Sequence, residues 1–333
     1  MINLSNQYLM KRLLLSALLI TLLAGCSKDP VPPFTFTPKP QIEGFYTSDI
    51  DLFWQAYDYM APNFTKENFQ TIYINNGTAG LKDYNAQKSI AINLEQVLGN
   101  DILMNYYTSI RTNSMDLQES IDKTKEGFQR FQELYPDAKL CDVYFLIGSL
   151  SAAGRVSDNG ILIAAEFFTR TDQSDLSALD EDLQPIFLTK DYIPSVVVHE
   201  LVHQQQLANP NGSYATLLQH SILEGMADYI ACQVLPDAPF YNQHIYNVDD
   251  TMEEQIWTDF KKEMNMSYDE TDWLYSWKTT SNGYPGNSGY YIGYKICEAY
   301  AAQFDTKEEA IAAMLQTSDY VALYNESGYD GGN

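Results

Sequence analysis

The chain has 333 residues, a length that fits one large domain or two closely packed ones. Hydrophobic residues make up 45% of it and aromatic residues 13%, which is typical of a folded protein and not of a disordered one. The formal net charge is -24 at pH 7, and so acidic a surface argues against nucleic acid or anionic lipid as a binding partner.

The N-terminus has the features of a lipoprotein signal. Two basic residues at 11–12 precede an apolar run over residues 13–24, which is too short to span a bilayer. The small residues before Cys26 resemble the bacterial lipobox, which is cut just before the cysteine. We therefore expect residues 1–25 to be a signal peptide and Cys26 to carry the lipids that anchor the protein. An ordinary secretory signal with a chance cysteine is the alternative.

The lipid anchor predicts a place in the bacterial cell envelope. Ser27 does not resemble an inner-membrane retention signal, so we expect the outer membrane and leave its periplasmic and surface faces open. Residues 26–44 are predicted to be a tether, because the proline-rich stretch at 30–41 favours an extended chain.

Residues 45–333 are predicted to form a single domain of the α+β class. It has three parts, which are helical residues 45–138, a small sheet within residues 139–190 and helical residues 191–333. The sheet is expected from two β-rich runs at 140–148 and 160–168, with an Asp-Asn-Gly turn between them.

The third part contains an HExxH motif, formed by His199, Glu200 and His203. Positions i and i+4 share one face of a helix, so both imidazoles can point at the same metal ion. Glu200 lies about 100° round the helix, which is the place of a general base. The motif also occurs by chance, and catalytic zinc usually takes three protein ligands, so a third ligand must follow.

The next predicted helix, residues 216–235, supplies a candidate third ligand. The metzincin pattern fails, because Gln206 and Asn209 stand where that pattern needs a glycine and a histidine. The helix is mostly apolar, yet Glu224 and Asp228 lie four apart on one face. Acidic residues are costly there unless they are paired or coordinated. The alternative is that Glu224 is an acidic residue at the start of the helix and that Asp228 is its solvated partner.

An HExxH motif followed about twenty residues later by ExxxD resembles the gluzincins, thermolysin and its relatives. The resemblance implies one Zn²⁺ ion held by His199, His203 and Glu224. It also implies that Asp228 hydrogen-bonds a ligand histidine, expected to be His199. The implied fold is mainly helical, with a small sheet beside the HExxH helix.

The chain is also similar, from about residue 45 onward, to predicted zinc-protease lipoproteins related to the gliding-motility lipoprotein GldB of Bacteroidota. The similarity rests on HExxH, on the EGxAD sequence around Glu224 and on the Tyr-Gly run in residues 283–300. Residues 145–168 resemble the strand pair of that family. Asn287 stands where the family usually has an acidic residue.

The Tyr-Gly run contains candidate donors for an oxyanion. Attack on a peptide carbonyl creates a negatively charged oxygen, and a phenol that keeps its proton at pH 7 can donate to it. Tyr290, Tyr291 and Tyr294 are the candidates, and Tyr291 is preferred. Aromatic packing within the helix is the alternative for at least two of them.

Two further residues are candidate substrate contacts. In gluzincins an edge strand beside the metal helix pairs with the substrate, and residues 160–168 are predicted to be that strand. Glu166 then either holds a substrate amine or faces solvent. His220, four residues before Glu224, is a rival ligand, a substrate contact or a local hydrogen-bond partner.

The sequence therefore predicts a membrane-anchored zinc metallopeptidase of the gluzincin type, acting on a peptide or protein. Glu200 takes a proton from the attacking water and passes it to the leaving amine. The alternative is an envelope-assembly or gliding-motility lipoprotein with a structural or vestigial zinc site. A structural site normally has four protein ligands, and the three found here favour the enzyme.

Overall fold

The computed structural model of the protein describes residues 34–36, 44–179, 181, 183–207, 215–276 and 278–332. The predicted signal peptide, Cys26 and most of the predicted tether lie outside the described residues. The helices and strands below all belong to one unit of the chain, which runs from Phe36 to Asn333.

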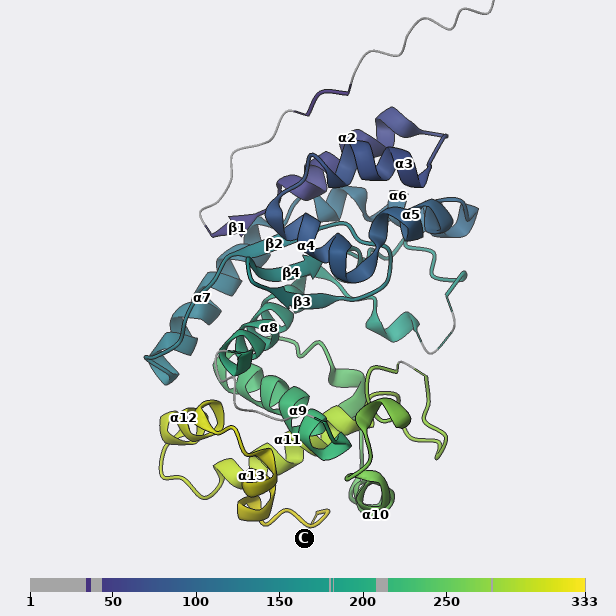
Figure 1. Cartoon of the computed structure of the whole chain (residues 1–333). Coiled ribbons are helices and arrows are strands. Elements are labelled where there is room, and N and C mark those ends of the chain that lie inside the picture. Colours follow the sequence, from purple (N-terminus) through teal and green to yellow (C-terminus); the bar gives the residue numbers. More distant parts are fainter. Residues whose placement is uncertain are drawn as a thin grey trace, which may run out of the picture. The chain divides into compact units, whose positions relative to one another are not determined.

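A group of helices comes first along this unit. They are α2 (Ser48–Met60), α3 (Lys66–Asn68), the π-helix η1 (Phe69–Ile74), α4 (Ala79–Lys88), α5 (Ile90–Leu98), α6 (Asp101–Ser114) and α7 (Gln118–Leu134). Side chains before two of the helices set where they begin. Thr78 accepts a hydrogen bond from the backbone of Leu81, and Asn100 accepts one from Leu103. Helices α2 to α6 lie on one side of the sheet (Figure 1).

The sheet has the strand order β1-β2-β4-β3, with β1 (Phe45–Tyr46), β2 (Val143–Leu146), β3 (Gly154–Ser157) and β4 (Gly160–Ala164). Strands β1, β2 and β4 are parallel, and β3 runs antiparallel to β4. Every residue of β2 and β4 is buried, as expected for apolar strands with helices on both faces. This small mixed sheet among helices confirms the predicted α+β class.

The order of the strands corrects the prediction for residues 160–168. Strand β4 pairs on both sides, so the edge strand of this part of the sheet is β3. The strand ends at Ala164, and residues 165–167 turn inward as the 3-10 helix η2. Glu166 is fully buried and accepts hydrogen bonds from the backbone N–H groups of Gly148 and Leu150. It neither faces solvent nor lines the cleft described below, so both predicted roles for Glu166 are wrong.

The C-terminal helices form the rest of the domain. Two short 3-10 turns, η3 (Gln184–Ile186) and η4 (Lys190–Tyr192), lead into α8 (Ile193–Leu207). Then follow α9 (Leu217–Val234), η5 (Gln243–Tyr246), α10 (Asp250–Glu263), η6 (Tyr268–Glu270), α11 (Ser288–Ala301), α12 (Lys307–Gln316) and α13 (Tyr320–Ser327). Helix α9 begins with a capping box, in which Thr216 and Gln219 bond each other's backbone N–H.

Helix α8 lies between the sheet and the C-terminal helices (Figure 1). Val196, Val197 and Val198 are almost completely buried, so this part of α8 lies inside the domain. Helices α9 and α11 cross closely at two glycines, because a β carbon on Gly225 or Gly293 would overlap the backbone of the other helix. This crossing fixes the position of the part of α9 that carries Glu224.

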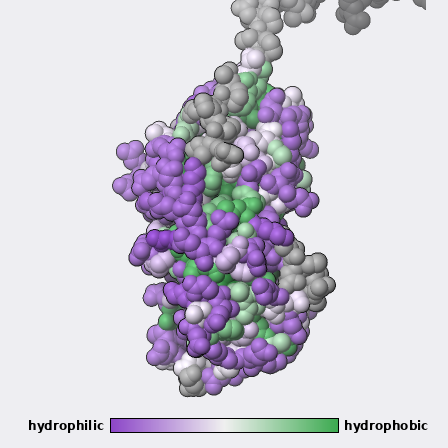
Figure 2. Space-filling model, turned by 90° about the vertical axis from the view of Figure 1, so that its left-hand side faces the viewer, coloured by the Kyte–Doolittle hydropathy of each residue, from purple (hydrophilic) through white to green (hydrophobic). Residues whose placement is uncertain are grey.

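Hydrophilic residues cover most of the face seen in Figure 2, and a hydrophobic strip runs between them through the middle of the domain. This distribution agrees with the large excess of acidic over basic residues. Within the described ranges, no helix combines the length and the hydrophobicity that a membrane crossing requires.

The buried Glu166 leads to a prediction for the pH dependence of stability. Burial raises the pKa of its carboxyl group from 4.5 to about 7. Because this pKa is raised in the folded state, the stabilising contribution is complete below pH 4.5 and is lost as the pH rises through 7. We expect the stability of the wild type, relative to Glu166→Gln, to fall by about 3 kcal/mol over this range. Urea unfolding of both proteins from about pH 4 to about pH 8 measures this, and a constant difference would contradict it.

Candidate metal centre

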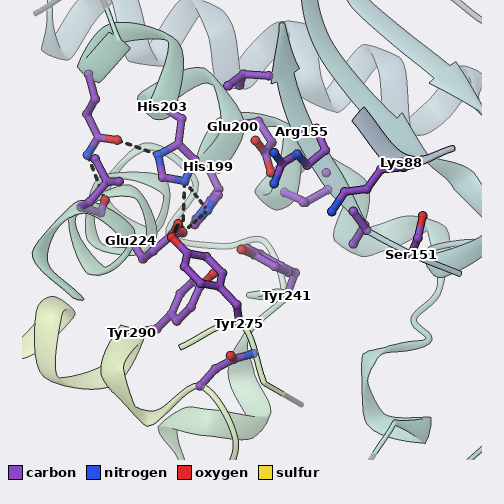
Figure 3. Close-up of a pocket in the computed structure, with 18 residues that line it drawn as sticks. Lys88, Ser151, Arg155, His199, Glu200, His203, Glu224, Tyr241, Tyr275 and Tyr290 are labelled. Atoms are coloured by element: carbon purple, nitrogen blue, oxygen red, sulfur yellow. Dashed lines mark hydrogen bonds and ion pairs between the residues drawn. The ribbon is translucent and has the colours of Figure 1, made fainter. Parts of the chain in front are cut away.

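Helices α8 and α9 pack against each other and bring three possible metal ligands together. His199, His203 and Glu224 each place one ligand atom within 4.8 Å of the others. The Oε2 atom of Glu224 is 3.4 Å from Nε2 of His199 and 3.1 Å from Nε2 of His203. The two Nε2 atoms are 3.0 Å apart (Figure 3). The structure thus brings together all three ligands that the sequence predicted.

The other ring nitrogen of each histidine has its own partner. Nδ1 of His199 is 2.7 Å from Oδ1 of Asp228, the contact predicted from the sequence. Nδ1 of His203 is 2.6 Å from Oε1 of Gln206. The amide nitrogen of Gln206 donates to the carbonyl of Leu223, so the amide oxygen is the atom that faces the imidazole. Both Nδ1 atoms therefore act as donors, and both Nε2 atoms present lone pairs when the rings are neutral.

This arrangement fits a divalent cation. When both rings are neutral, two imidazole lone pairs and a carboxylate oxygen meet at one point, which is unfavourable without a cation there. The set of two histidines and one glutamate is a known ligand set of catalytic zinc. Among the described residues, His199, His203 and Glu224 are the group whose atoms converge in this way.

The electrostatics of the three ligands agree with a preference for positive charge. Burial by itself lowers the pKa of His199, but Asp228 and Glu224 raise it to about 10. The pKa of His203 is raised as well, because Glu224 outweighs the effect of burial. Burial acts to raise the pKa of Glu224, and the two histidines hold it well below its ordinary value. Protons supply the positive charge when no metal is bound.

Asp228 is itself held in place. It is fully buried, accepts two hydrogen bonds from Nδ2 of Asn242 at 3.0 and 3.2 Å, and accepts one from the hydroxyl of Tyr246 at 2.8 Å. The carboxylate that orients His199 is therefore fixed by the segment around η5. Nothing in the local spacing of Asn242 and Tyr246 indicated this role in the sequence.

Glu200 lies in the same cleft as the ligands. The cleft has a volume of about 370 Å³ and is lined by all four residues of the predicted centre. Glu200 extends toward β3, where a β carbon on Gly154 would overlap its carboxylate. Burial raises the pKa of Glu200, although both histidines oppose this. A buried carboxylate with a raised pKa beside the metal site is suited to accept and hold a proton.

The predicted tyrosines are distributed differently from the expectation. Tyr290 lines the cleft, whereas the hydroxyl of Tyr291 donates to Glu253, 2.6 Å away, on another side of α11. Tyr294 packs its ring against Tyr229 and Tyr246. The preference for Tyr291 is therefore corrected. Neighbouring helical residues point about 100° apart, and the glycine contact of α11 with α9 turns position 290 toward the cleft.

Two other tyrosines in the cleft were missed. Figure 3 shows Tyr241 and Tyr275 beside Tyr290, below Glu224. The hydroxyl of Tyr275 donates to Oε1 of Glu224 at 2.7 Å, and the ring of Tyr241 stands edge-on to His199 at 5.2 Å. Both residues come from irregular segments, where no periodic pattern indicated a role for them.

His220 is connected to the candidate ligand Glu224 through the hydroxyl of Tyr275. Its Nδ1 atom is 3.1 Å from the hydroxyl of Tyr275, and its ring lies against Tyr268 with the centroids 3.6 Å apart. It does not line the cleft and does not belong to the converging ligand set. Of the roles considered for His220, the local hydrogen-bond partner is the one that this geometry fits.

The contact between Gln206 and His203 leads to a prediction about metal affinity. Gln206→Leu removes the acceptor that holds Nδ1 of His203, so we expect zinc to bind 10- to 100-fold more weakly, an order-of-magnitude effect of such ligand-orienting residues. Gln204→Leu is the matched control, since Gln204 bonds the carbonyl of Ser157 and contacts neither ligand histidine. Competition with a chromogenic zinc chelator measures both affinities. Equal affinities in the two variants would show that Gln206 does not orient the ligand.

Comparison with known proteins supports one family. The sequence model of the family described as "Gliding motility protein GldB" matches residues 44–331, which is nearly the whole described chain. No curated protein and no solved structure matches the chain. The match agrees with a lipid-anchored protein of the cell envelope, as expected from the N-terminus. With its predicted lipid anchor and its helical domain around one small sheet, this chain belongs to the GldB family of gliding motility lipoproteins.

Proposed function

We propose that this GldB-family lipoprotein is a zinc-dependent peptidase anchored in the outer membrane. One observation supports the proposal above all. Nε2 of His199, Nε2 of His203 and a carboxylate oxygen of Glu224 converge, while Asp228 and Gln206 hold both histidines in the tautomer that ligands need. Glu200 stands in the same cleft in the position of a general base.

Different residues of the cleft would carry out different steps of peptide hydrolysis. A zinc ion at the three ligands would polarise the substrate carbonyl and make water a nucleophile at neutral pH. Glu200 accepts the proton of the attacking water and passes it to the leaving amine. Tyr241 and Tyr290, whose pKa values are raised well above 10 by burial, keep their protons and can donate to the oxyanion.

Strand β3 takes the substrate-pairing role that was first expected for residues 160–168. It is an edge strand, and it borders the cleft at Gly154 and Arg155. The backbone carbonyl of Ala153 accepts a hydrogen bond from the N–H of Ala164. In an antiparallel pair of strands, hydrogen-bonded residues alternate with residues whose backbone groups point outward. The N–H and C=O of Gly154, the next residue, therefore point away from β4. An extended peptide can pair with these groups beside Glu200.

The second candidate function is a component of the gliding or envelope-assembly machinery in which zinc is structural or the site is vestigial. The family match favours this function more directly than a peptidase, because its description concerns motility and not hydrolysis. The geometry favours the enzyme. A structural zinc site is normally closed by four protein ligands, and three converge among the described residues.

Substitution of the base separates these candidates. We expect Glu200→Gln to bind as much zinc as the wild type and to lose cleavage of a mixed peptide library by 10²-fold or more, since it cannot accept a proton. Metal analysis and mass spectrometry of the products measure both properties. Glu133→Gln, an exposed change on α7, is the control that keeps full activity.

One result would reject the peptidase, and another would reject the role of Glu200. A zinc-loaded wild type that cleaves no peptide in the library would support the motility component with a structural or vestigial site. Equal cleavage by the wild type and by Glu200→Gln would remove Glu200 from the mechanism.

A further inference from the structure

The cleft has a basic end that the proposed reaction does not use. Lys88, the last residue of α4, and Arg155 in β3 both line it. In Figure 3 the three ligands lie at one side, Glu200 and Arg155 come next, and Lys88 lies beyond them. Two basic residues in one cleft stand out in a chain with 20 Lys and Arg against 44 Asp and Glu.

Neither cation forms a direct ion pair with a carboxylate of the described residues. Nε of Arg155 donates to the neutral amide oxygen of Gln87 at 3.0 Å. Among the described residues, no ion pair joins Lys88 or Arg155 to a carboxylate, whereas Lys190 on the surface pairs with Asp116 at 3.2 Å. Glu200, which lies beside Arg155 in the cleft, is the carboxylate whose pKa Arg155 acts to lower.

The two cations also disfavour each other. Burial lowers the pKa of Lys88, and the positive charge of Arg155 lowers it further. Like charges that interact in one cleft are unfavourable, and an anion bound near both relieves the repulsion. A guanidinium and an ammonium are the two groups that bind carboxylates best, the first through two parallel hydrogen bonds and the second as a point charge.

The proposed reaction indicates which part of the substrate would lie at this basic end. Glu200 must deliver its proton to the leaving amine, so the C-terminal part of a bound peptide lies on the side of Glu200. Lys88 and Arg155 lie on this side, away from the metal ligands (Figure 3). The volume of the cleft, about 370 Å³, is that of a small-molecule site, which leaves room for a short segment of peptide.

We propose that Lys88 and Arg155 form a subsite for a carboxylate on the C-terminal side of the scissile bond of the substrate. The carboxylate is the free C-terminus of a short peptide or the side chain of an aspartate or glutamate. The orientation of the peptide rests on the proposed function, whereas binding of the carboxylate can be tested on protein that does not turn over.

The test uses zinc-loaded Glu200→Gln protein, which retains the cleft, and matched short peptides. One pair differs only in a free C-terminal carboxylate against a C-terminal amide. A second pair, amidated at the C-terminus, differs in aspartate against asparagine near the end. We expect the acidic member of at least one pair to bind with a Kd at least tenfold lower, measured by calorimetry, and the ratio to shrink at high salt.

Variants of the basic residues complete the test. Lys88→Gln and Arg155→Gln, each made in the Glu200→Gln protein, are expected to bring the ratio of the two Kd values close to one. Lys82→Gln, an exposed change on the same helix α4 that does not line the cleft, is the control that keeps the ratio. A response to the first peptide pair identifies the C-terminal carboxylate as the ligand, and a response to the second identifies an acidic side chain.

Failure of this subsite and failure of the peptidase are distinguishable. Equal binding within both pairs overturns the subsite, whatever the wild type cleaves. Selective binding of an acidic peptide by Glu200→Gln supports the subsite, and if the wild type then cleaves nothing, only the peptidase is rejected. A wild type that cleaves both members of both pairs with equal kcat/KM supports the peptidase and overturns the subsite.

Discussion

Two imidazole nitrogens and one carboxylate oxygen meet inside the domain, and the packing of α8, α9 and α11 holds them there. Three acceptor atoms within 4.8 Å of one another are unstable together unless a positive charge joins them. The surrounding contacts keep them together nonetheless. Asp228 and Gln206 hold the far side of each imidazole, and the close crossing of α9 and α11 at Gly225 and Gly293 holds the backbone next to Glu224.

The three glutamines that follow His203 show how α8 is fixed around this centre. Gln204 bonds the carbonyl of Ser157 in β3, and Gln205 bonds both backbone groups of Lys139. Gln206 bonds His203 in its own helix and the carbonyl of Leu223 in α9. Each amide ties the helix to a different neighbour, so the helix that carries two ligands and the base cannot rotate freely. Rigid placement of this kind is what a metal centre requires of its scaffold.

The sequence was sufficient for the metal ligands because they depend on helical spacing, which is local. His199 and His203 share a face by the period of the helix, and Glu224 with Asp228 stood out as acids on an apolar helix. Tyr290 was confused with Tyr291 because the rotation of α11 is set by its glycine contact with α9. The edge strand was misplaced because strand order depends on long-range pairing. Tyr275 acts through a long-range contact with Glu224 that no local pattern encodes. Gln206 lies three residues after His203 on the same helix, a local spacing that had been used only to exclude the metzincin pattern.

A crystal structure of the zinc-loaded protein, with anomalous scattering at the zinc edge, would show whether the three candidate ligands hold a metal ion. We expect one zinc ion about 2.0–2.2 Å from Nε2 of His199, Nε2 of His203 and a carboxylate oxygen of Glu224, with the fourth position open to the cleft. Absence of an anomalous peak at these atoms would contradict it. So would a fourth protein ligand, such as the hydroxyl of Tyr275, because a closed site binds zinc for structure and not for catalysis.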